Sequence, residues 1–238
     1  MTALLAVETS SPVLSLALKD PKGKVHTCQV KGLMKHAEEI LPQIEALFKK
    51  SKTSWKDLGA FLIGRGPGSF TGLRVGFATL KGFLTGGDVS CFGALSLDLI
   101  AENKTFEKLP EGAKLAVALD AFRERIYFRL YEQDEGNWTA ENKTQILSID
   151  ETLKALPAGA WITGNALAKY EASFKSLNAE KKIHWAAEAD WFPQAAALIE
   201  FFERQDPKLE KLPRENLLPF YFRLSEAEER MRPHVPAC

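Results

Sequence analysis

Three short stretches of this sequence hold residue types that could bind phosphate or a cation. Glu8-Thr9-Ser10 follow a short apolar run, Asp120 follows a second one, and a glycine-rich stretch extends from Gly64 to Gly72. A carboxylate at the end of a strand can hold a cation through water, and free N–H groups at a helix N-terminus attract anions. Nucleotide binding is therefore the first chemistry to compare with the spacing of these residues.

The glycine-rich stretch, GRGPGSFTG, does not match the known phosphate-binding loops. A Walker loop needs a Gly-Lys pair five places after its first glycine, and a dinucleotide fingerprint needs a third glycine where Ser69 or Thr71 stands. A nucleophile elbow needs glycine two residues before its serine, where Pro67 stands. We expect a tight structural turn in which Ser69 or Thr71 caps a following helix. The residues of this turn are Gly64, Arg65, Gly66, Pro67, Gly68, Ser69, Thr71 and Gly72.

Histidine and cysteine spacing predicts neither a metal site nor a catalytic residue. His26 and Cys28 would share one side of a strand, but two ligands do not make a zinc site. Ser69, His36 and Asp120 could be imagined as a hydrolytic triad, yet nothing in their spacing supports one, and triads are recognised by geometry. We therefore expect no metal and no cofactor.

The elements that would position these residues follow from the apolar patterns of the first half. Strands are predicted at residues 4–7, 13–18, 24–30, 60–63 and 89–92, and helices at 34–50, 72–84 and 95–102. The first helix has amphipathic spacing, and Pro42 should kink it because its nitrogen cannot bond the carbonyl of Glu38. The second helix is apolar nearly all round, which is typical of a helix covered on every side.

The second half of the chain repeats this order of elements. Strands are predicted at residues 115–120, 125–131, 145–148, 161–163 and 184–185, and helices at 150–156, 166–177 and 192–204. The order β-β-β-α-β-α-β resembles the ribonuclease-H-like layout, a mixed sheet with helices on its faces. We predict an α/β fold with subdomains at residues 1–108 and 109–211 and a tail at 212–238.

The run GRGPGSFTGLRVGFATLKG at residues 64–82 resembles the signature of the bacterial TsaB family, also called YeaZ. Weaker matches lie at residues 4–10 and 35–42, and Pro219-Phe220-Tyr221-Phe222-Arg223 is similar to a segment near the family's C-terminus. The resemblance implies two ribonuclease-H-like subdomains of the actin and sugar-kinase (ASKHA) superfamily. Family members are subunits of the machinery that makes threonylcarbamoyladenosine beside the anticodon of tRNAs.

Compared with the ATPases of that superfamily, both acidic turns lack part of the residue set that binds magnesium and phosphate. Working ATPases carry an Asp for magnesium and a Gly-Thr pair for phosphate after the first strand, and no glycine follows either acidic residue here. Glu8, Thr9, Ser10 and Asp120 are thus candidates for a vestigial nucleotide site only. The related catalytic subunit, TsaD, holds its metal with two His four apart on a helix, and here Ile40 stands four residues after His36.

The resemblance implies a non-catalytic subunit that binds and stabilises TsaD, which transfers the threonylcarbamoyl group to tRNA. A TsaE-type ATPase would join the assembly, tRNA would be contacted only through the complex, and the chain alone could form a homodimer. The alternative is an active enzyme, either an actin-fold ATPase or a metal-dependent peptidase. Tight magnesium-ATP binding that is lost on Glu8→Ala or Asp120→Ala would favour this alternative.

In the family, the pair of helices that corresponds to those predicted at 34–50 and 72–84 packs against the matching pair of TsaD. The second helix has more hydrophobic surface than one sheet face covers, so an exposed apolar patch could remain. Alternatively, both helices simply bury one face on the sheet. Arg65 and Arg74 could pair with acids on a partner or contact an anion. The predicted interface residues are His36, Glu39, Ile40, Gln43, Ile44, Leu47, Leu73, Arg74, Phe77, Leu80 and Lys81.

Composition is consistent with a cytoplasmic protein that depends on a partner for tRNA binding. The 238 residues include 31 basic and 31 acidic side chains, whereas a protein that binds tRNA by itself usually has a basic excess. The three Cys lack a paired spacing, which suggests a reducing compartment. No signal peptide is evident, and no apolar stretch approaches the roughly 20 residues that span a bilayer.

Overall fold

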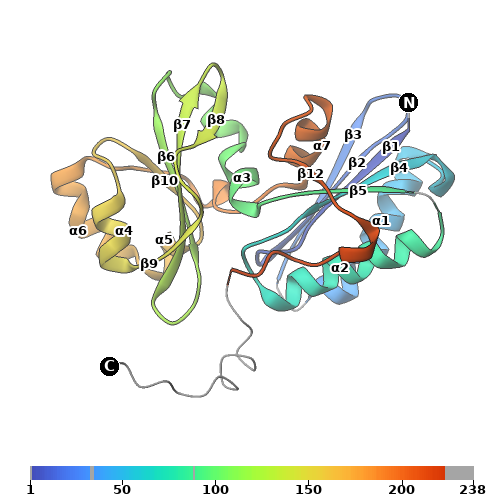
Figure 1. The fold of residues 1–238 in the computed structure, drawn as a ribbon, viewed down its shortest axis with the longest axis horizontal. Coiled ribbons are helices and arrows are strands. Elements are labelled where there is room, and N and C mark those ends of the chain that lie inside the picture. Colours follow the sequence, from blue (N-terminus) through green and yellow to red (C-terminus); the bar gives the residue numbers. More distant parts are fainter. Residues whose placement is uncertain (1, 33–34, 88, 223–238) are drawn as a thin grey trace.

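A computed structural model describes residues 2–32, 35–87 and 89–222 of the chain. Within these residues, two mixed β-sheets stand side by side, and helices flank each of them (Figure 1). We call the part built on the N-terminal sheet the first lobe and the part built on the other sheet the second lobe. The predicted α/β class is confirmed.

The first lobe contains a six-stranded sheet with strand order β12-β5-β4-β1-β2-β3. Strand β1 pairs in parallel with β4 and antiparallel to β2. Both β1 and β4 are almost wholly buried because helices cover both faces of the sheet, so their sequences read as continuous apolar runs. The strands are β1 (Ala3–Glu8), β2 (Val13–Lys19), β3 (Val25–Lys31), β4 (Leu58–Gly64), β5 (Ser90–Ala94) and β12 (Glu210–Lys211).

Helices α1 (His36–Ser51) and α2 (Phe70–Thr85) cover one face of the first sheet, and α7 (Ala195–Glu203) packs on the other. On the α1 and α2 side, Val7, Ile44 and Phe77 belong to one core cluster. On the α7 side, Leu62 and Leu198 belong to another. The sheet is therefore sandwiched between two helical layers.

The second lobe has a sheet with strand order β11-β10-β6-β7-β8, and β9 also pairs with β7. Its strands are β6 (Lys114–Asp120), β7 (Arg125–Asp134), β8 (Asn137–Ala140), β9 (Gln145–Ser148), β10 (Trp161–Thr163) and β11 (His184–Trp185). Its helices are α4 (Ile149–Ala155), α5 (Ala166–Lys169) and α6 (Glu171–Lys181). Short 3-10 helices lie at Trp55–Asp57, Lys104–Lys108, Glu188–Asp190 and Arg214–Asn216.

The two lobes exchange helices across the space between them. Helix α3 (Ser96–Ala101) follows β5 of the first sheet, yet Leu97 and Ile100 lie in the core cluster of the second sheet. Helix α7 follows the second-lobe strands in sequence, yet its core packs on the first sheet. Figure 1 shows α3 and α7 between the two sheets. Each sheet thus obtains one covering helix from beyond its own run of strands.

Most predicted elements are found within a few residues of their predicted bounds, and three features differ. Two short strands, β8 and β12, were not predicted. The helix predicted over 166–177 is broken at Tyr170 into α5 and α6. The helix predicted over 192–204 begins only at Ala195, because Gln194 is extended and the Ala195 N–H donates a bond of 3.0 Å to the Ser15 hydroxyl. Helix α1 continues through Pro42 as predicted, and the kink there stays a prediction.

The predicted division at residue 108 stays a prediction, although α7 and β12 lie beyond it and belong to the first lobe by packing. The tail enters the first-lobe core through Leu212 and Leu217. The start of the helix predicted at residue 34 and the charged segment 225–232 lie outside the described residues.

Candidate functional site

The acidic turn after β1 is closed on itself. The Glu8 side chain is fully buried, and its Oε1 accepts a hydrogen bond of 2.5 Å from the Ser10 N–H. Its Oε2 accepts a bond of 2.8 Å from the hydroxyl of Ser96, at the start of α3. Burial raises the pKa of Glu8 above its ordinary value, although the bonds to Ser10 and Ser96 oppose that rise. Both carboxylate oxygens are therefore engaged within the chain.

The predicted glycine-rich turn packs directly against this acidic turn. The Ser69 N–H donates a bond of 2.6 Å to the carbonyl of Ser10, and the Ser69 hydroxyl caps α2 by accepting from the Gly72 N–H. A Cβ at Gly64 would overlap the Glu8 carboxylate, and one at Gly72 would overlap the carbonyl of Thr9. The glycines allow two backbones to approach closely, and the expectation of a structural turn fits this packing.

This packing does not fit a bound nucleotide. A phosphate loop needs free N–H groups and space beside them. Here the Ser10 N–H is bonded to Glu8, and the Ser69 N–H is bonded to Ser10. Among the described side chains, the Thr9 hydroxyl is buried without a hydrogen-bond partner, but it faces the glycine face of α2 at Gly76.

The second acidic turn is neutralised by a lysine that sequence reasoning missed. The Asp120 carboxylate accepts bonds of 2.9 and 3.0 Å from Lys169 Nζ in α5. It also accepts a bond from the Phe122 N–H. Figure 1 places α5 beside β6, so a strand end and a distant helix meet here. No sequence signal pointed to this ion pair, because Lys169 lies 49 residues after Asp120.

Neither a triad nor a metal centre forms around the other predicted residues. The ring nitrogens of His36 lie 3.2 and 3.0 Å from the carbonyl oxygens of Gly32 and Ser11, so this buried ring ties the strand ends together. His26 pairs with Asp20 at 3.0 Å rather than with Cys28. The described part of the chain holds no cluster of three or more His, Cys, Asp or Glu that could bind a metal ion.

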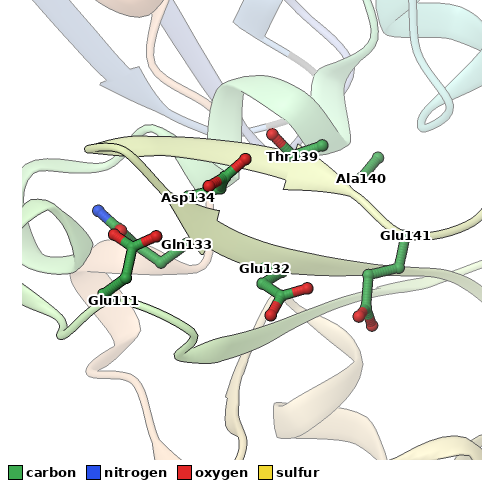
Figure 2. Close-up of a pocket in the computed structure, with 7 residues that line it drawn as sticks. All are labelled: Glu111, Glu132, Gln133, Asp134, Thr139, Ala140 and Glu141. Atoms are coloured by element: carbon green, nitrogen blue, oxygen red, sulfur yellow. The ribbon is translucent and has the colours of Figure 1, made fainter.

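An acidic pocket opens at the far edge of the second sheet (Figure 2). Glu132 and Glu141 point to the same side in Figure 2, and Lys114 forms ion pairs with both. Glu111 accepts bonds from the backbone N–H of Glu135. The pocket is lined by Glu111, Glu132, Gln133, Asp134, Thr139, Ala140 and Glu141. Most of its carboxylates are already partnered, and no predicted site residue lies there.

Seven of the predicted interface residues are core residues, which corrects the prediction for them. Their side chains are at most 3% exposed, because five of them point from α1 and α2 into the first-lobe core, His36 bonds loop carbonyls and Leu73 lies against Gly66. They are His36, Ile40, Ile44, Leu47, Leu73, Phe77 and Leu80. Glu39 and Gln43 are half-buried and hydrogen-bonded to each other, whereas Arg74 and Lys81 are exposed.

The two predicted arginines make contacts within the chain. The Arg65 guanidinium forms an ion pair of 2.5 Å with Glu210 in β12. The Arg74 guanidinium lies 3.9 Å from the ring centroid of Phe70. The acid that pairs with Arg65 therefore belongs to this chain.

The outward faces of α1 and α2 form a continuous candidate surface, because the two helices pack beside each other. Leu41 is 58% exposed and is the large apolar side chain on this surface. Sequence reasoning missed Leu41 because it belongs to the same apolar pattern as the core residues. We define the α1/α2 face by its exposed residues, which are Ala37, Glu38, Leu41, Pro42, Glu45, Ala46, Lys49, Thr71, Arg74, Ala78, Lys81 and Gly82.

Comparisons with known proteins agree with the fold described above. A family model described as "TsaD: tRNA N6-adenosine threonylcarbamoyltransferase" matches residues 32–203. The tRNA threonylcarbamoyladenosine biosynthesis protein TsaB of Escherichia coli is 30% identical over 164 residues, which cover 67% of this chain and 69% of that protein. The protein of the same name from Haemophilus influenzae is 34% identical over 125 residues, 52% of each chain.

The solved structure of YeaZ from Pseudomonas aeruginosa has the same fold. Its TM-score is 0.75 at 22% identity, with 93% of this chain and 100% of that chain covered. Two ribonuclease-H-like lobes with mixed sheets place the protein in the ASKHA superfamily. Within it, this chain belongs to the TsaB (YeaZ) family. No helix in the described ranges is long and apolar enough to cross a membrane.

Proposed function

We propose that this chain is a non-catalytic subunit in tRNA threonylcarbamoyladenosine biosynthesis and that it binds a TsaD-type catalytic subunit. The observation that carries the proposal is the exposed α1/α2 face, which leaves Leu41 58% exposed beside an otherwise closed core. The names of its TsaB relatives supply the process.

The absence of a catalytic role is supported by the state of both acidic turns. Glu8 is buried against Ser10 and Ser96, and Asp120 is paired with Lys169. Catalysis of phosphoryl transfer needs a magnesium ligand and donors aimed at phosphate oxygens. In the described structure these groups are committed to contacts within the chain.

The composition of the α1/α2 face suits packing against another pair of helices. Ala37, Ala46, Ala78 and Gly82 are small and exposed, so a partner helix can approach the backbone closely. Leu41 supplies an apolar anchor at the centre of α1. The exposed charges of α2 are the basic Arg74 and Lys81, whereas α1 is acidic in its first turn and basic in its last, and this pattern favours one orientation of the partner.

The remaining partners follow from this arrangement. A balanced net charge supports a model in which tRNA is bound by the complex and not by this chain alone. A TsaE-type ATPase would join through the complex. In the absence of TsaD, the same face would pair two copies of this chain as a homodimer.

The test is size-exclusion chromatography with light scattering, applied to the chain alone and mixed with a TsaD homologue from the same organism. We expect a stable mixed complex. Leu41→Glu and Ala78→Glu should weaken it about 30-fold or more, which is the loss typical of a binding hot spot. Ala172→Glu, at an exposed position of α6 in the second lobe, is the matched control and should leave the complex unchanged.

Two results would argue against the proposal. The first is no association at micromolar concentrations, with circular dichroism showing that both proteins are folded. The second is equal affinity of the Leu41→Glu, Ala78→Glu and Ala172→Glu variants for TsaD, which would move the interface elsewhere. Tight binding of magnesium-ATP to the isolated chain would instead revive the enzyme alternative.

A further inference from the structure

The segment after the last 3-10 helix, residues 217–222, contacts both lobes. We propose that residues 219–222 form a strap that covers the glycine-rich turn and fastens the first lobe to the second. The strap contains the Pro-aromatic motif of the sequence, to which the proposed function gives no role. The inference is independent of TsaD binding.

The segment is anchored in the first lobe before it reaches the second. The Leu212 N–H donates a bond of 2.8 Å to the carbonyl of Cys91 in β5. The Leu217 side chain is 3% exposed and belongs to the core cluster that α1 and α2 cover. These contacts fix the path of the chain up to Leu217, so the next residues extend from a rigid support.

The strap then crosses the glycine-rich turn. The Phe220 N–H donates a bond of 2.9 Å to the carbonyl of Arg65, whose guanidinium lies 5.6 Å from the Phe220 ring centroid. The Tyr221 ring lies 4.7 Å from the ring of Phe70, the first residue of α2. Gly66 has a φ of +93° and lies against the Phe220 carbonyl, so a side chain there would be strained and crowded.

The last described residue completes the connection to the second lobe. The Phe222 ring lies 5.9 Å from the ring of Tyr127 in β7 and packs, half-buried, against the second-lobe core. It also lies 4.7 Å from the Phe220 ring. A row of aromatic rings therefore leads from the glycine-rich turn to β7, and such ring pairs add to the stabilisation that burial provides.

The strap adds a third connection between the two lobes. The described chain passes between the lobes at α3 and before α7, and these two helices contact each other. The strap lies beside the start of α3, because Gly66, which lies against the Phe220 carbonyl, also accepts a bond of 2.8 Å from the Ser96 N–H. Two neighbouring connections allow a hinge rotation. The strap is a third connection, made by a different segment of the chain, and it opposes that rotation.

The strap is also suited to detach from the two lobes. Phe220 and Tyr221 remain 44% and 41% exposed, so much of their ring surface is still in contact with water. Contacts of this kind open more readily than a closed core. Release would uncover the glycine-rich turn and free the second lobe in one step.

The experiment is amide hydrogen–deuterium exchange on three forms of the chain, which are the full chain, a chain that ends after Phe222 and a chain that ends after Leu218. Loss of the strap should make exchange about two- to tenfold faster in two regions, the range expected for lost aromatic contacts. These regions are residues 65–70 in the first lobe and residues 121–127 in the second. The chain that ends after Phe222 is the reference, so that each difference reports the loss of residues 219–222 alone.

Point variants separate the two ends of the strap. Phe222→Ala should speed exchange in residues 121–127 more than in residues 65–70, because it removes the ring that contacts β7 but leaves the Phe220 bond to Arg65 in place. Leu218→Ala changes a side chain that is 56% exposed in the same segment, and it should alter neither region. Circular dichroism confirms that each variant is folded.

Two outcomes would overturn the strap. If exchange in residues 121–127 is the same in the chains ending after Leu218 and after Phe222, the segment does not fasten the second lobe. If only residues 65–70 respond in every variant, the segment is a cap on the first lobe.

Discussion

Glu8 combines a charged side chain with complete burial, and this sets a pH dependence for stability. Its carboxyl has a raised pKa in the folded chain because burial disfavours the ionised form. The folded state therefore holds the proton more tightly than the unfolded state, whose pKa is near 4.5. The stability contributed by this group is complete below that value and is lost as pH rises through the folded pKa.

We predict that Glu8→Gln removes this loss and flattens the fall in unfolding free energy as pH rises from 4.5 toward neutrality. The glutamine oxygen can accept from the Ser10 N–H, and its amide can donate to the Ser96 hydroxyl. Urea unfolding at several pH values measures the effect. Glu38→Gln, at an exposed position of α1, is the control and should leave the slope of the wild-type chain in place. An unchanged slope in Glu8→Gln would contradict the prediction.

Two glycines of α2 should respond in opposite directions to the same substitution. A Cβ at Gly72 would overlap the Thr9 carbonyl, whereas a Cβ at Gly82 would meet no atom within 4 Å. Gly72→Ala should lower the unfolding free energy by about 1–3 kcal/mol through overpacking. Gly82→Ala should raise it by about 0.5–1 kcal/mol, since alanine restricts the unfolded chain. Thermal denaturation of the isolated chain measures both changes in unfolding free energy. An increase for Gly72→Ala would contradict the prediction and show that the turn can shift to make room for a Cβ.

At the scale of elements, helix α3 is joined to β7 by a buried polar cluster. Asp98 is 3% exposed, and its Oδ1 accepts bonds of 2.9 Å from Arg129 and 2.7 Å from the Tyr131 hydroxyl. Burial raises the pKa of Asp98, and the Arg129 charge opposes the rise. Since α3 begins in the first lobe and packs on the second, this cluster fixes one of the connections between them.

We predict that Asp98→Ala lowers the unfolding free energy by about 3–5 kcal/mol, because it leaves the Arg129 charge without its buried partner. Replacing Asp98, Arg129 and Tyr131 together by Leu, Met and Phe should restore much of the loss. Glu171→Ala removes an exposed ion pair with Lys175 and should cost less than about 1 kcal/mol. Urea denaturation compares the variants, and an equal cost for Asp98→Ala and Glu171→Ala would refute the cluster's role.

Sequence patterns located the strands and helices well but did not decide which face of each helix is exposed. Alternation and apolar runs are local properties, so β1, β4 and β6 were found close to their observed bounds. Strand β12 has only two residues and forms by pairing with β5, a distant partner that sequence does not reveal. On α1, Leu41 and Ile44 lie in one apolar pattern, and only the packed sheet shows that Ile44 faces inward.

The candidate site could also be predicted only in part from the sequence, because some of its contacts join residues far apart along the chain. The glycine-rich turn and the lack of glycine in both acidic turns were readable from the sequence. The contacts that fill those turns come from Ser96 and Lys169, which lie far along the chain. Such pairings depend on the tertiary fold, so spacing could not predict them.

At the scale of the whole molecule, the exchanged helices make the lobes dependent on each other. Without α7, the first sheet would expose the apolar face that includes Ala6, Ala60 and Leu62. Large exposed apolar faces drive aggregation. Neither lobe therefore has a complete core within the strands and helices nearest to it in sequence.

We predict that residues 1–108, expressed alone, do not fold, even though they contain five of the strands of the first sheet. Circular dichroism and thermal denaturation should show no cooperative transition, whereas the full chain should unfold in one. Adding residues 109–238 as a separate chain should restore the transition. Cooperative unfolding of the 1–108 fragment by itself would mean that α7 is dispensable.

The close fit of Glu8 and Thr9 against Gly64, Gly72 and Gly76 has a consequence for how the acidic turn could change over evolutionary time. A phosphate-binding loop would need a longer, glycine-containing turn in place of residues 8–10, and the space for it is already filled by complementary backbone. A single substitution on either side leaves a clash or a void with the other. A nucleotide-binding turn at this place would therefore require several simultaneous changes, in residues 8–10 and in the glycines that pack against them.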